Sequence, residues 1–344
     1  MGLTGFKMER LALAVTGIGL IVVGTRLLQR KRTDLRGQVV LITGSSRGLG
    51  LALAEEFARV GARLVICSRN TRDLKHAQHM LTQQGAEVLA IECDVSDKEQ
   101  VQRMVTQATE HYGQVDILVN NAGIISAGPL QTLTQNDFTE AMDIIFWGTY
   151  NTTMEVLPQM LKRKNGRITN IASIGGKVSV PHLLPYSSAK FALVGFSEGL
   201  RAELAKDGIA VTTVAPGLMR TGSHINTLMK GSKYREEYTA FTLLDTLPFT
   251  SISAKRAAKQ IVAATQRGSA EVIIGVQAQL LARFHGIFPG ITTDIMGLVN
   301  RLLPSSQGTG TESHSGIESE TTITRSFLTT LGQKASKNYN QTTD

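Results

Sequence analysis

Short apolar runs alternate with helical patterns along most of the chain. The apolar runs are VVLIT (39–43), RLVICS (63–68), EVLAIEC (87–93), DILVN (116–120), RITNIAS (167–173), IAVTTVAP (209–216) and EVIIG (271–275). Strands buried on both faces form nearly continuous apolar runs, and strand–helix alternation is typical of a parallel sheet covered by helices on both sides. Because crossover connections are right-handed, such a sheet is doubly wound. We therefore predict an α/β fold, with one doubly wound domain over residues 37–275 and a seven-stranded parallel sheet flanked by helices.

The N-terminal residues 1–36 differ from this pattern. Residues 11–25 (LALAVTGIGLIVVGT) carry no charge, and the apolar stretch extends to residue 28 if Arg26 reaches the membrane surface. A cleavable signal peptide is disfavoured, because no A-x-A-like site is present and a basic cluster follows the apolar run. We interpret residues 1–36 as a membrane anchor with a basic flank and residues 11–28 as its membrane-embedded part. A peripheral hairpin or a buried helix is the alternative. The richer basic flank on the C-terminal side favours a cytoplasmic main domain.

Two further segments follow the alternating region. Residues 276–303 are apolar and are interrupted by Pro289-Gly290, and their large apolar residues follow helical spacing on both sides of this break. This apolar extension fits core packing, a dimer contact, a membrane-surface helix or a lid over a substrate. Residues 304–344 are rich in Ser, Thr, Gly, Gln and Asn and hold few large apolar side chains. We therefore predict a disordered tail there.

Composition and charge restrict the function classes. Hydrophobic residues make up 42% of the chain and charged residues 19%, which is enough apolar material for a sizeable core. The net charge is +8, but residues 1–36 hold seven basic and two acidic side chains and so carry five of these charges. The rest of the chain is nearly balanced, so we predict no nucleic-acid partner. The two cysteines, Cys67 and Cys93, lie in strand-like runs, where buried reduced thiols are expected, and we predict no metal site.

A glycine-rich segment directly follows the first apolar run. Residues 43–50 read TGSSRGLG, and the helical pattern LALAEEFARVG comes next. A glycine-rich turn between a strand and a helix lets backbone N–H groups approach a pyrophosphate at the helix N-terminus. The spacing G-x-x-x-G-x-G differs from the commoner G-x-G-x-x-G. At the start of a seven-strand alternation, this turn predicts a dinucleotide-binding site.

Six motifs, taken in order, resemble those of the short-chain dehydrogenase/reductase family. They are TGSSRGLG (43–50), Asp94-Val95, NNAG (120–123), Ser173, Tyr186-Ser-Ser-Ala-Lys190 and PGLMRT (216–221). Each motif alone is modest evidence, but their order and spacing over residues 37–275 make the resemblance specific. It implies a Rossmann-type domain, a nicotinamide cofactor and hydride transfer between a carbonyl and an alcohol. Homodimers or homotetramers are usual in this family.

Three residues of these motifs suit proton transfer. Tyr186 and Lys190 are four positions apart on a predicted helix and so share one face. A tyrosine has a reference pKa of about 10, and a neighbouring cation favours the phenolate and lowers that pKa. The resemblance implies that Tyr186 is the proton donor and acceptor and that Lys190 contacts the cofactor ribose and tunes this pKa. It also implies that Ser173 orients the substrate carbonyl.

The end of the second predicted strand indicates which cofactor is used. NAD-preferring relatives have an acidic residue near this point, which accepts hydrogen bonds from the ribose hydroxyls. This chain has Arg69 there and Arg47 in the glycine-rich loop, and two guanidinium groups can bind a 2′-phosphate. We therefore predict NADP(H). By resemblance, Asp94 contacts the adenine and Thr221 reaches the nicotinamide carboxamide. The full set of predicted cofactor-binding residues is Gly44, Ser46, Arg47, Gly48, Leu49, Gly50, Arg69, Asp94, Val95, Asn121, Gly123, Tyr186, Lys190, Pro216, Gly217 and Thr221.

One position departs from the family pattern. Relatives carry an Asn in the long helix after the fourth strand, three residues before a Gly, and this chain has Ile145 before Gly148. An aliphatic side chain cannot hold the water through which Lys190 would be reprotonated, and Asn151 is almost two helical turns away. Either another group or bulk water reprotonates Lys190, or turnover is reduced.

The segment from Gly217 to about Phe249 is the expected substrate loop. It contains several Met, Tyr, Phe and Leu residues, which either suit a lipophilic ligand or pack among themselves. Together with the predicted anchor, it favours an NADPH-dependent reductase of a keto-lipid, retinoid or steroid-like ketone. The alternatives are a 3-oxoacyl reductase acting on soluble acyl substrates and a cofactor-binding scaffold with little turnover.

Overall fold

The computed structural model describes residues 32–305, 310–326 and 329–341. The chain divides into a unit that ends at Asp34 and a unit that begins at Leu35, and the first unit is described only at residues 32–34. The predicted membrane-embedded segment at residues 11–28 therefore lies outside the described residues. In the part of the chain that is described, no helix has both the length and the apolar character needed to cross a membrane.

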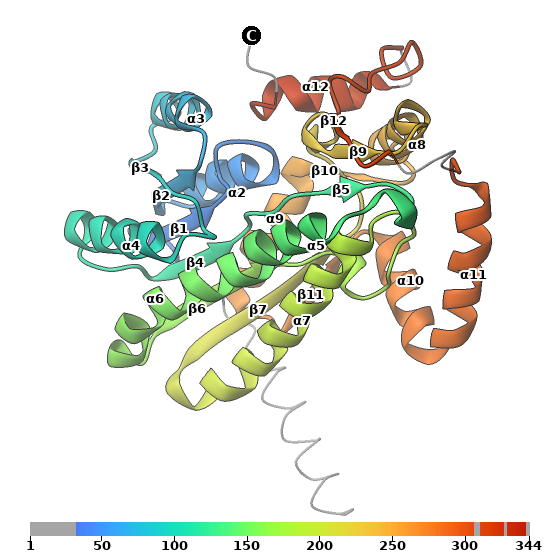
Figure 1. Cartoon of the computed structure of the whole chain (residues 1–344). Coiled ribbons are helices and arrows are strands. Elements are labelled where there is room, and N and C mark those ends of the chain that lie inside the picture. Colours follow the sequence, from blue (N-terminus) through green and yellow to red (C-terminus); the bar gives the residue numbers. More distant parts are fainter. Residues whose placement is uncertain (1–31, 306–309, 327–328, 342–344) are drawn as a thin grey trace, which may run out of the picture. The chain divides into compact units, whose positions relative to one another are not determined.

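Seven parallel strands form the central sheet, in the order β11-β7-β6-β4-β1-β2-β3 (Figure 1). The predicted seven-stranded parallel sheet is confirmed. Its strands are β1 (Val39–Thr43), β2 (Arg63–Ser68), β3 (Val88–Glu92), β4 (Ile117–Asn120), β6 (Gly166–Ile171), β7 (Ile209–Pro216) and β11 (Glu271–Ile274). Two small sheets are formed by β5 (Ser126–Ala127), β8 (Met219–Arg220), β9 (Leu228–Lys230), β10 (Ile252–Ser253) and β12 (Ser313–Ser315).

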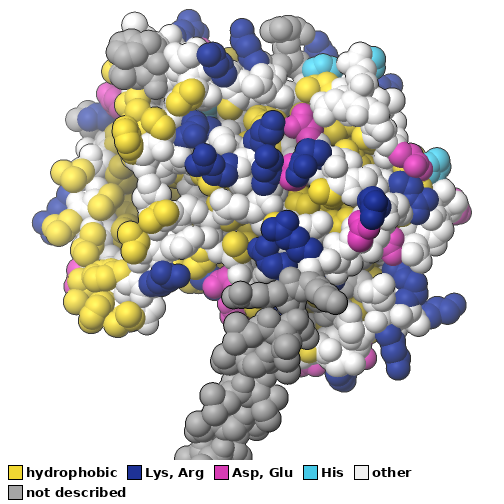
Figure 2. All heavy atoms as spheres, turned by 180° about the vertical axis from the view of Figure 1, so that it is seen from behind, with side chains coloured by type: hydrophobic (Ala, Val, Ile, Leu, Met, Phe, Trp, Pro, Cys, Tyr) yellow, Lys and Arg dark blue, Asp and Glu magenta, His cyan; other side chains and the backbone are white. Residues whose placement is uncertain are grey.

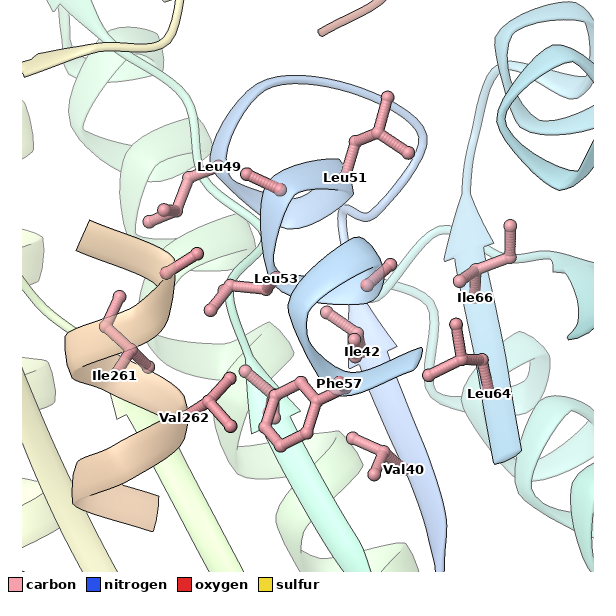
Figure 3. Packing of buried hydrophobic residues seen from close by; sticks show 14 of the residues in the cluster. Val40, Ile42, Leu49, Leu51, Leu53, Phe57, Leu64, Ile66, Ile261 and Val262 are labelled. Carbon is pink, nitrogen blue, oxygen red and sulfur yellow. The ribbon is translucent and has the colours of Figure 1, made fainter. Parts of the chain in front are cut away.

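Helices connect the strands and cover both faces of the central sheet. The α-helices of the described residues, in chain order, are α2 (Gly48–Arg59), α3 (Thr71–Gln83), α4 (Lys98–Tyr112), α5 (Gln135–Ala141), α6 (Gly148–Arg163), α7 (Leu184–Leu204), α8 (Tyr234–Thr246), α9 (Ala254–Arg267), α10 (Val276–Ile287), α11 (Pro289–Leu302) and α12 (Thr330–Asn338). Alternate residues of one strand face different helices. In β1, Val40 and Ile42 pack with α2, α3 and α9, and Figure 3 shows Phe57 of α2 in this layer. Val39 and Leu41 pack with α4 and α6 on the other face. Burial on both faces explains the continuous apolar runs of the strands.

The direction of strand order reverses between β1 and β4. β2 and β3 extend the sheet on one side of β1, whereas β4, β6, β7 and β11 extend it on the other. In open α/β sheets, ligands bind beyond the carboxyl ends of the strands at such a point, because the loops that follow diverge to opposite faces. The glycine-rich loop follows β1 and the NNAG motif follows β4, so the fold brings these two motifs to one crevice.

The apolar extension forms two helices with largely exposed apolar surfaces. α10 and α11 confirm the helical spacing, but Ala278 and Thr292 are the buried residues within them. Leu280 is 62% exposed, Ile291 53% and Leu298 58%. Figure 2 shows hydrophobic side chains gathered over the edge of the molecule that carries these helices. Of the roles expected for this extension, core packing within the described chain is therefore excluded for most of its large side chains.

The prediction of a disordered tail at residues 304–344 is wrong for its described residues. β12 pairs antiparallel with β9, and α12 lies beside α8 (Figure 1). The packing is close because the residues are small: a Cβ on Gly332 would lie 2.5 Å from Thr246 Oγ1. We expected order only where large apolar side chains build a core. This segment instead docks through small residues and hydrogen bonds onto a surface that the rest of the domain already provides.

Candidate active site

The glycine-rich loop between β1 and α2 forms a tight turn. Gly44 and Gly48 have φ angles of +60° and +59°, in the left-handed region that favours glycine. A Cβ on Gly44 would also lie 2.8 Å from Cα of Ala122 in the NNAG motif. The Asn121 side chain donates hydrogen bonds to the carbonyl oxygens of Thr43 and Gly44, both at 3.0 Å. Asn121 therefore supports the cofactor site by fixing the shape of this loop.

Backbone donors are free at the N-terminus of α2. The helix begins at Gly48, and no hydrogen bond among the described residues uses the N–H groups of Leu49 and Gly50. N-terminal N–H groups and the helix dipole favour a bound anion. A side chain at Gly50 would not fit in this turn, because a Cβ there would collide with the Gly44 carbonyl oxygen and would lie 2.7 Å from Asn121 Nδ2. The turn therefore fits the diphosphate of a dinucleotide.

A cavity of about 340 Å³ lies next to this turn. Most predicted site residues line it, namely Gly44, Ser46, Arg47, Gly48, Leu49, Gly50, Arg69, Asp94, Val95, Asn121, Gly123, Tyr186, Lys190 and Thr221. Ser173, Pro216 and Gly217 are not part of the lining. Gly217 instead packs against α10, where its Cβ would lie 3.0 Å from the side chain of Ala278. The lining also contains residues that the sequence did not indicate, including Asn226 and Gln341, because no local motif marks them.

Tyr186, Lys190 and Ser173 come together at the side of this cavity. Tyr186 and Lys190 share one face of α7, and Lys190 Nζ lies 5.5 Å from the centre of the Tyr186 ring. A Cβ on Gly175 would lie 3.2 Å from Tyr186 Cε1 and 3.5 Å from Ser173 Oγ, so both side chains border the same small space. Ser173 Oγ accepts a hydrogen bond from the Gly175 N–H at 3.0 Å. Its own proton can therefore be donated to Tyr186 or to a substrate oxygen.

Burial dominates the ionisation of the tyrosine and the lysine. Burial raises the pKa of the Tyr186 phenol, and the Ser173 hydroxyl acts in the opposite direction. Burial also lowers the pKa of Lys190 to about 7, and its Nζ donates to the Ile171 carbonyl oxygen at 2.7 Å. The lowering of the Tyr186 pKa that we expected from Lys190 stays a prediction, because burial is the largest effect on this phenol and raises its pKa, and burial also weakens the charge of the lysine. The neutral phenol is the form that donates a proton, as carbonyl reduction requires.

Lys190 should make the stability of the protein depend on pH. The usual lysine pKa is 10.5 and that of Lys190 is about 7, so between these values the unfolded chain binds one more proton than the folded chain. Stability should therefore rise with pH across this window, by up to about 1.4 kcal/mol per pH unit, and the full cost of the buried charge is present below it. Lys190→Met should lack this slope. Urea unfolding at about pH 7 and about pH 9 checks this, with exposed Lys162→Met as the control. Equal pH dependence of wild type and Lys190→Met would contradict it.

Ile145 lies in a π-helical turn between α5 and α6. The turn spans Met142–Trp147, and Ile145 is fully buried in an apolar cluster that includes Ala189. A Cβ on Gly123 would lie 3.9 Å from both Ile145 Cγ1 and Lys190 Nζ. The isoleucine side chain therefore lies near the lysine but offers no group that could hold a water or pass on a proton. π-Helical turns are frequent at functional sites, and this one sets the side-chain position in which relatives carry Asn.

Replacing Ile145 by asparagine should raise kcat with NADPH by roughly tenfold if proton supply to Lys190 limits turnover. The buried amide should also lower the free energy of unfolding by about 1–3 kcal/mol, because it enters an apolar cluster. Steady-state rates in H₂O and D₂O measure the first effect, and Ile145→Leu controls for repacking. Unchanged turnover in a folded Ile145→Asn protein would show that this position does not limit the relay.

Arg47 and Arg69 both line the cavity, near the ends of β1 and β2. Burial lowers the pKa of Arg47, Asp73 raises it, and the positive charge of Arg69 lowers it again. The two guanidinium groups therefore repel each other, and an anion between them would be stabilised. Each has one carboxylate nearby: Arg47 Nη1 lies 3.7 Å from Asp73 Oδ2, and Arg69 Nη1 lies 3.5 Å from Asp94 Oδ2.

The expected substrate loop is mostly a packed element. Residues 217–249 form β8, β9 and α8, and the buried Met229 and Tyr238 make a separate apolar cluster with Ala127. Met219 and Leu228 are the apolar side chains of this segment that line the cavity. They add to an apolar wall from other parts of the described chain, formed by Ile124, Ile125, Ile144 and Ile171. Self-packing thus explains most of the large side chains in this segment, and a smaller apolar wall faces the cavity.

Comparisons with known proteins identify the family of this chain. The family described as short chain dehydrogenase matches residues 38–230. A Drosophila melanogaster protein, dehydrogenase/reductase SDR family protein 7-like, is 31% identical over 274 residues, which cover 78% of this chain and 82% of that protein. Mouse dehydrogenase/reductase SDR family member 7B is 36% identical over 216 residues, which cover 61% of this chain and 67% of that protein.

Solved structures of reductases share the fold. L-sorbose reductase from Gluconobacter frateurii, complexed with NADPH and L-sorbose, matches with a TM-score of 0.63 and 27% identity, covering 71% of this chain and 97% of that one. A variant of actinorhodin polyketide ketoreductase with NADPH matches with a TM-score of 0.60 and 29% identity, covering 70% and 95%. The matched family, the order of the motifs and the shared sheet lead to one conclusion: this chain belongs to the short-chain dehydrogenase/reductase family and is an oxidoreductase of that type.

Proposed function

We propose that this protein is an NADPH-dependent carbonyl reductase that acts on a lipophilic ketone or aldehyde. The observation that carries the proposal is the position of a partly buried, neutral Tyr186 beside Ser173, next to a cavity with one apolar wall. A neutral phenol can protonate an oxygen that becomes an alkoxide, and an apolar wall suits a substrate with hydrocarbon on either side of its carbonyl.

Cofactor binding, substrate orientation and proton delivery are carried out by different residues of the chain. The nicotinamide cofactor, when bound, supplies the hydride. The free N–H groups of Leu49 and Gly50 hold its diphosphate at the N-terminus of α2. Ser173 orients the substrate carbonyl by donating a hydrogen bond to its oxygen, and Tyr186 delivers the proton to the same oxygen. Lys190 lies on the tyrosine's face of α7, where it holds the ribose and passes on a proton.

The preference for NADPH over NADH is supported by the charge at the adenosine end. Arg47 and Arg69 are within electrostatic range of each other and line the same cavity. A 2′-phosphate would relieve their repulsion, and the 2′-hydroxyl of NAD would not. The names of the two similar reductase structures also include NADPH.

Membrane association and self-association complete the proposal. The uncharged residues 11–25 with basic flanks suit an anchor at residues 11–28, with the catalytic domain in the cytoplasm. The exposed apolar surface of α10 and α11 suits contact with lipid or with a lipophilic substrate. We expect a homodimer or homotetramer, since Trp147 at the end of the π-helical turn before α6 and Phe191 on α7 are 47% and 41% exposed. Membrane fractionation of the full chain against a chain that begins at Thr33 tests the anchor.

A panel of carbonyl substrates tests the proposed activity. The detergent-extracted protein is given NADPH with long-chain ketones, retinaldehydes, steroid ketones and soluble 3-oxoacyl thioesters, and NADPH oxidation is followed. Turnover with the lipophilic compounds supports the proposal. Turnover with the thioesters alone favours a 3-oxoacyl reductase, which the similarity to a polyketide ketoreductase also suggests. NADPH binding without turnover on any compound favours a cofactor-binding scaffold, which Ile145 would explain.

A further inference from the structure

The C-terminal residues 339–341 reach the cofactor site from the far end of the chain. α12 ends at Asn338 and docks on the segment after β7, where a Cβ on Gly222 would lie 2.5 Å from Cα of Ser336. The residues after α12 then cross to the glycine-rich loop. Asn340 and Gln341 are buried, at 2% and 7% exposure, although their segment is polar throughout. Burial of two amide side chains calls for specific partners, since an unpaired amide in this environment is costly.

One side of this segment binds the glycine-rich loop. The Gly48 N–H, at the start of α2, donates to the Tyr339 carbonyl oxygen at 2.8 Å. Asn340 Nδ2 donates to the Ser46 carbonyl oxygen at 2.9 Å and to the Asp73 carbonyl oxygen at 3.0 Å. Its Oδ1 lies 2.7 Å from Nδ1 of His76 on α3. The Asn340 amide therefore joins residues 339–341 to the loop that follows β1, through Ser46, and to α3, through Asp73 and His76.

The other side of this segment binds the opposite wall of the cavity. Gln341 Nε2 donates to the Thr221 carbonyl oxygen at 3.2 Å, and Gln341 Oε1 accepts from Asn226 Nδ2. Thr221 and Asn226 line the cavity from the segment after β7, and Gln341 itself is part of the lining. A Cβ on Gly48 would lie 2.6 Å from Gln341 Nε2, so glycine there makes room for the glutamine. Residues 339–341 thus connect the two walls between which a dinucleotide would lie.

We propose that residues 339–341 are a strap that closes over the bound cofactor and slows its release. The proposal rests on the proposed use of a nicotinamide cofactor. Asn340 and Gln341 act as positioning residues, because they hold the glycine-rich loop and the segment carrying Thr221 in a fixed relation. The strap leaves the binding groups accessible: it occupies the Gly48 N–H, while the N–H groups of Leu49 and Gly50 stay free among the described residues. It therefore forms one wall of the cavity and does not fill it.

Removal of the Asn340 side chain tests the strap. Asn340 has a φ of +52°, so Asn340→Gly keeps the backbone relaxed and deletes only the amide. NADPH release from the full-length protein is measured by stopped-flow fluorescence, with excess NADP⁺ as the competitor. The dissociation rate and Kd should both rise about tenfold, because the hydrogen bonds from this amide to the Ser46 carbonyl oxygen of the loop and to the Asp73 carbonyl oxygen of α3 are lost. Asn338→Gly makes the same change at the exposed last residue of α12 and should leave release unchanged.

Hydrogen exchange gives an independent measurement. If the strap favours bound cofactor, NADPH must favour the docked strap by the same factor, so amides in residues 330–341 should exchange more slowly when NADPH is bound. Faster exchange with NADPH, or tighter binding by Asn340→Gly, would mean that the segment competes with the cofactor and would overturn the strap. Unchanged release from Asn340→Gly would overturn it as well. If wild type binds neither NADPH nor NADH, the proposed function fails first and the strap fails with it.

Discussion

Replacing Tyr186 by phenylalanine is expected to lower kcat for carbonyl reduction by about 10²–10⁴-fold, with little change in NADPH affinity. The substitution removes the only atom of this side chain that can protonate the substrate oxygen. It keeps the ring, which lies against Gly175 and beneath the Lys190 ammonium, so the local packing should survive. The measurement is steady-state NADPH oxidation with the best substrate of the carbonyl panel, alongside NADPH binding by fluorescence.

A matched substitution separates chemistry from a general effect on α6 and α7. Tyr150 of α6 is 37% exposed and contacts the ring of Phe196, outside the lining of the cavity. Tyr150→Phe makes the same chemical change and should leave kcat within experimental error. If Tyr186→Phe turns over as fast as wild type while still binding NADPH, Tyr186 is not the proton donor. The scaffold interpretation would then gain its strongest support.

The sheet was predictable because its strands are buried on both faces. The boundaries of β1, β2 and β7 coincide with the apolar runs at 39–43, 63–68 and 209–216. Residues 39–42 of β1 are all apolar and buried, whereas the helices around it combine buried apolar with exposed polar positions. The glycine-rich loop was equally predictable. Its backbone is left-handed at Gly44 and Gly48, and this conformation favours glycine, which the sequence shows directly.

The C-terminal segment was not predictable for the opposite reason. Its order depends on side-chain amides that bond to groups far away in the chain, and Asn340 and its acceptor Ser46 are 294 positions apart. A Ser- and Thr-rich composition usually means disorder, and nothing local distinguishes a polar segment that has a prepared docking surface. The buried hydrogen bond between Asn120 and Asn170 could not be predicted from the sequence either, because each residue lies within an apolar strand run and no local pattern pairs them.

The ionisation of the active site also needed the structure. The four-residue spacing of Tyr186 and Lys190 places them on one face of α7, and this part of the prediction holds. The spacing does not report that Lys190 is buried and that Tyr186 is partly buried. Lys190 is 4% exposed, and its desolvation lowers the pKa to about 7. The charge that was expected to act on the tyrosine is therefore itself weakened by burial.

Replacing Arg47 and Arg69 together by alanine is expected to raise the KM for NADPH by about 100-fold, with little effect on the KM for NADH. A charge-assisted hydrogen bond contributes about 1.5–3 kcal/mol, and the lower end applies because both arginine side chains are partly exposed, at 42% and 56%. Two such losses come to about 3 kcal/mol, which corresponds to about two orders of magnitude. Initial rates at varied NADPH and NADH, at low and at high salt, give the comparison.

The neighbouring carboxylates do not cancel this effect, because neither is placed to replace a phosphate. Asp94 Oδ1 is held by the N–H and the hydroxyl of Ser96, which leaves only Oδ2 toward Arg69, at 3.5 Å. The Arg47 pair with Asp73 is longer still, at 3.7 Å. Arg47 Nη1 also donates to Asn226 Oδ1 at 2.8 Å, a hydrogen bond to a neutral acceptor that is weaker than one to a phosphate. A 2′-phosphate can therefore compete for both arginines, and the NADPH preference should shrink as salt screens it. Arg103→Ala, which removes an exposed arginine paired with Glu99, is the control. An equal rise of both KM values in the double variant would show that these arginines serve loop structure and not cofactor choice.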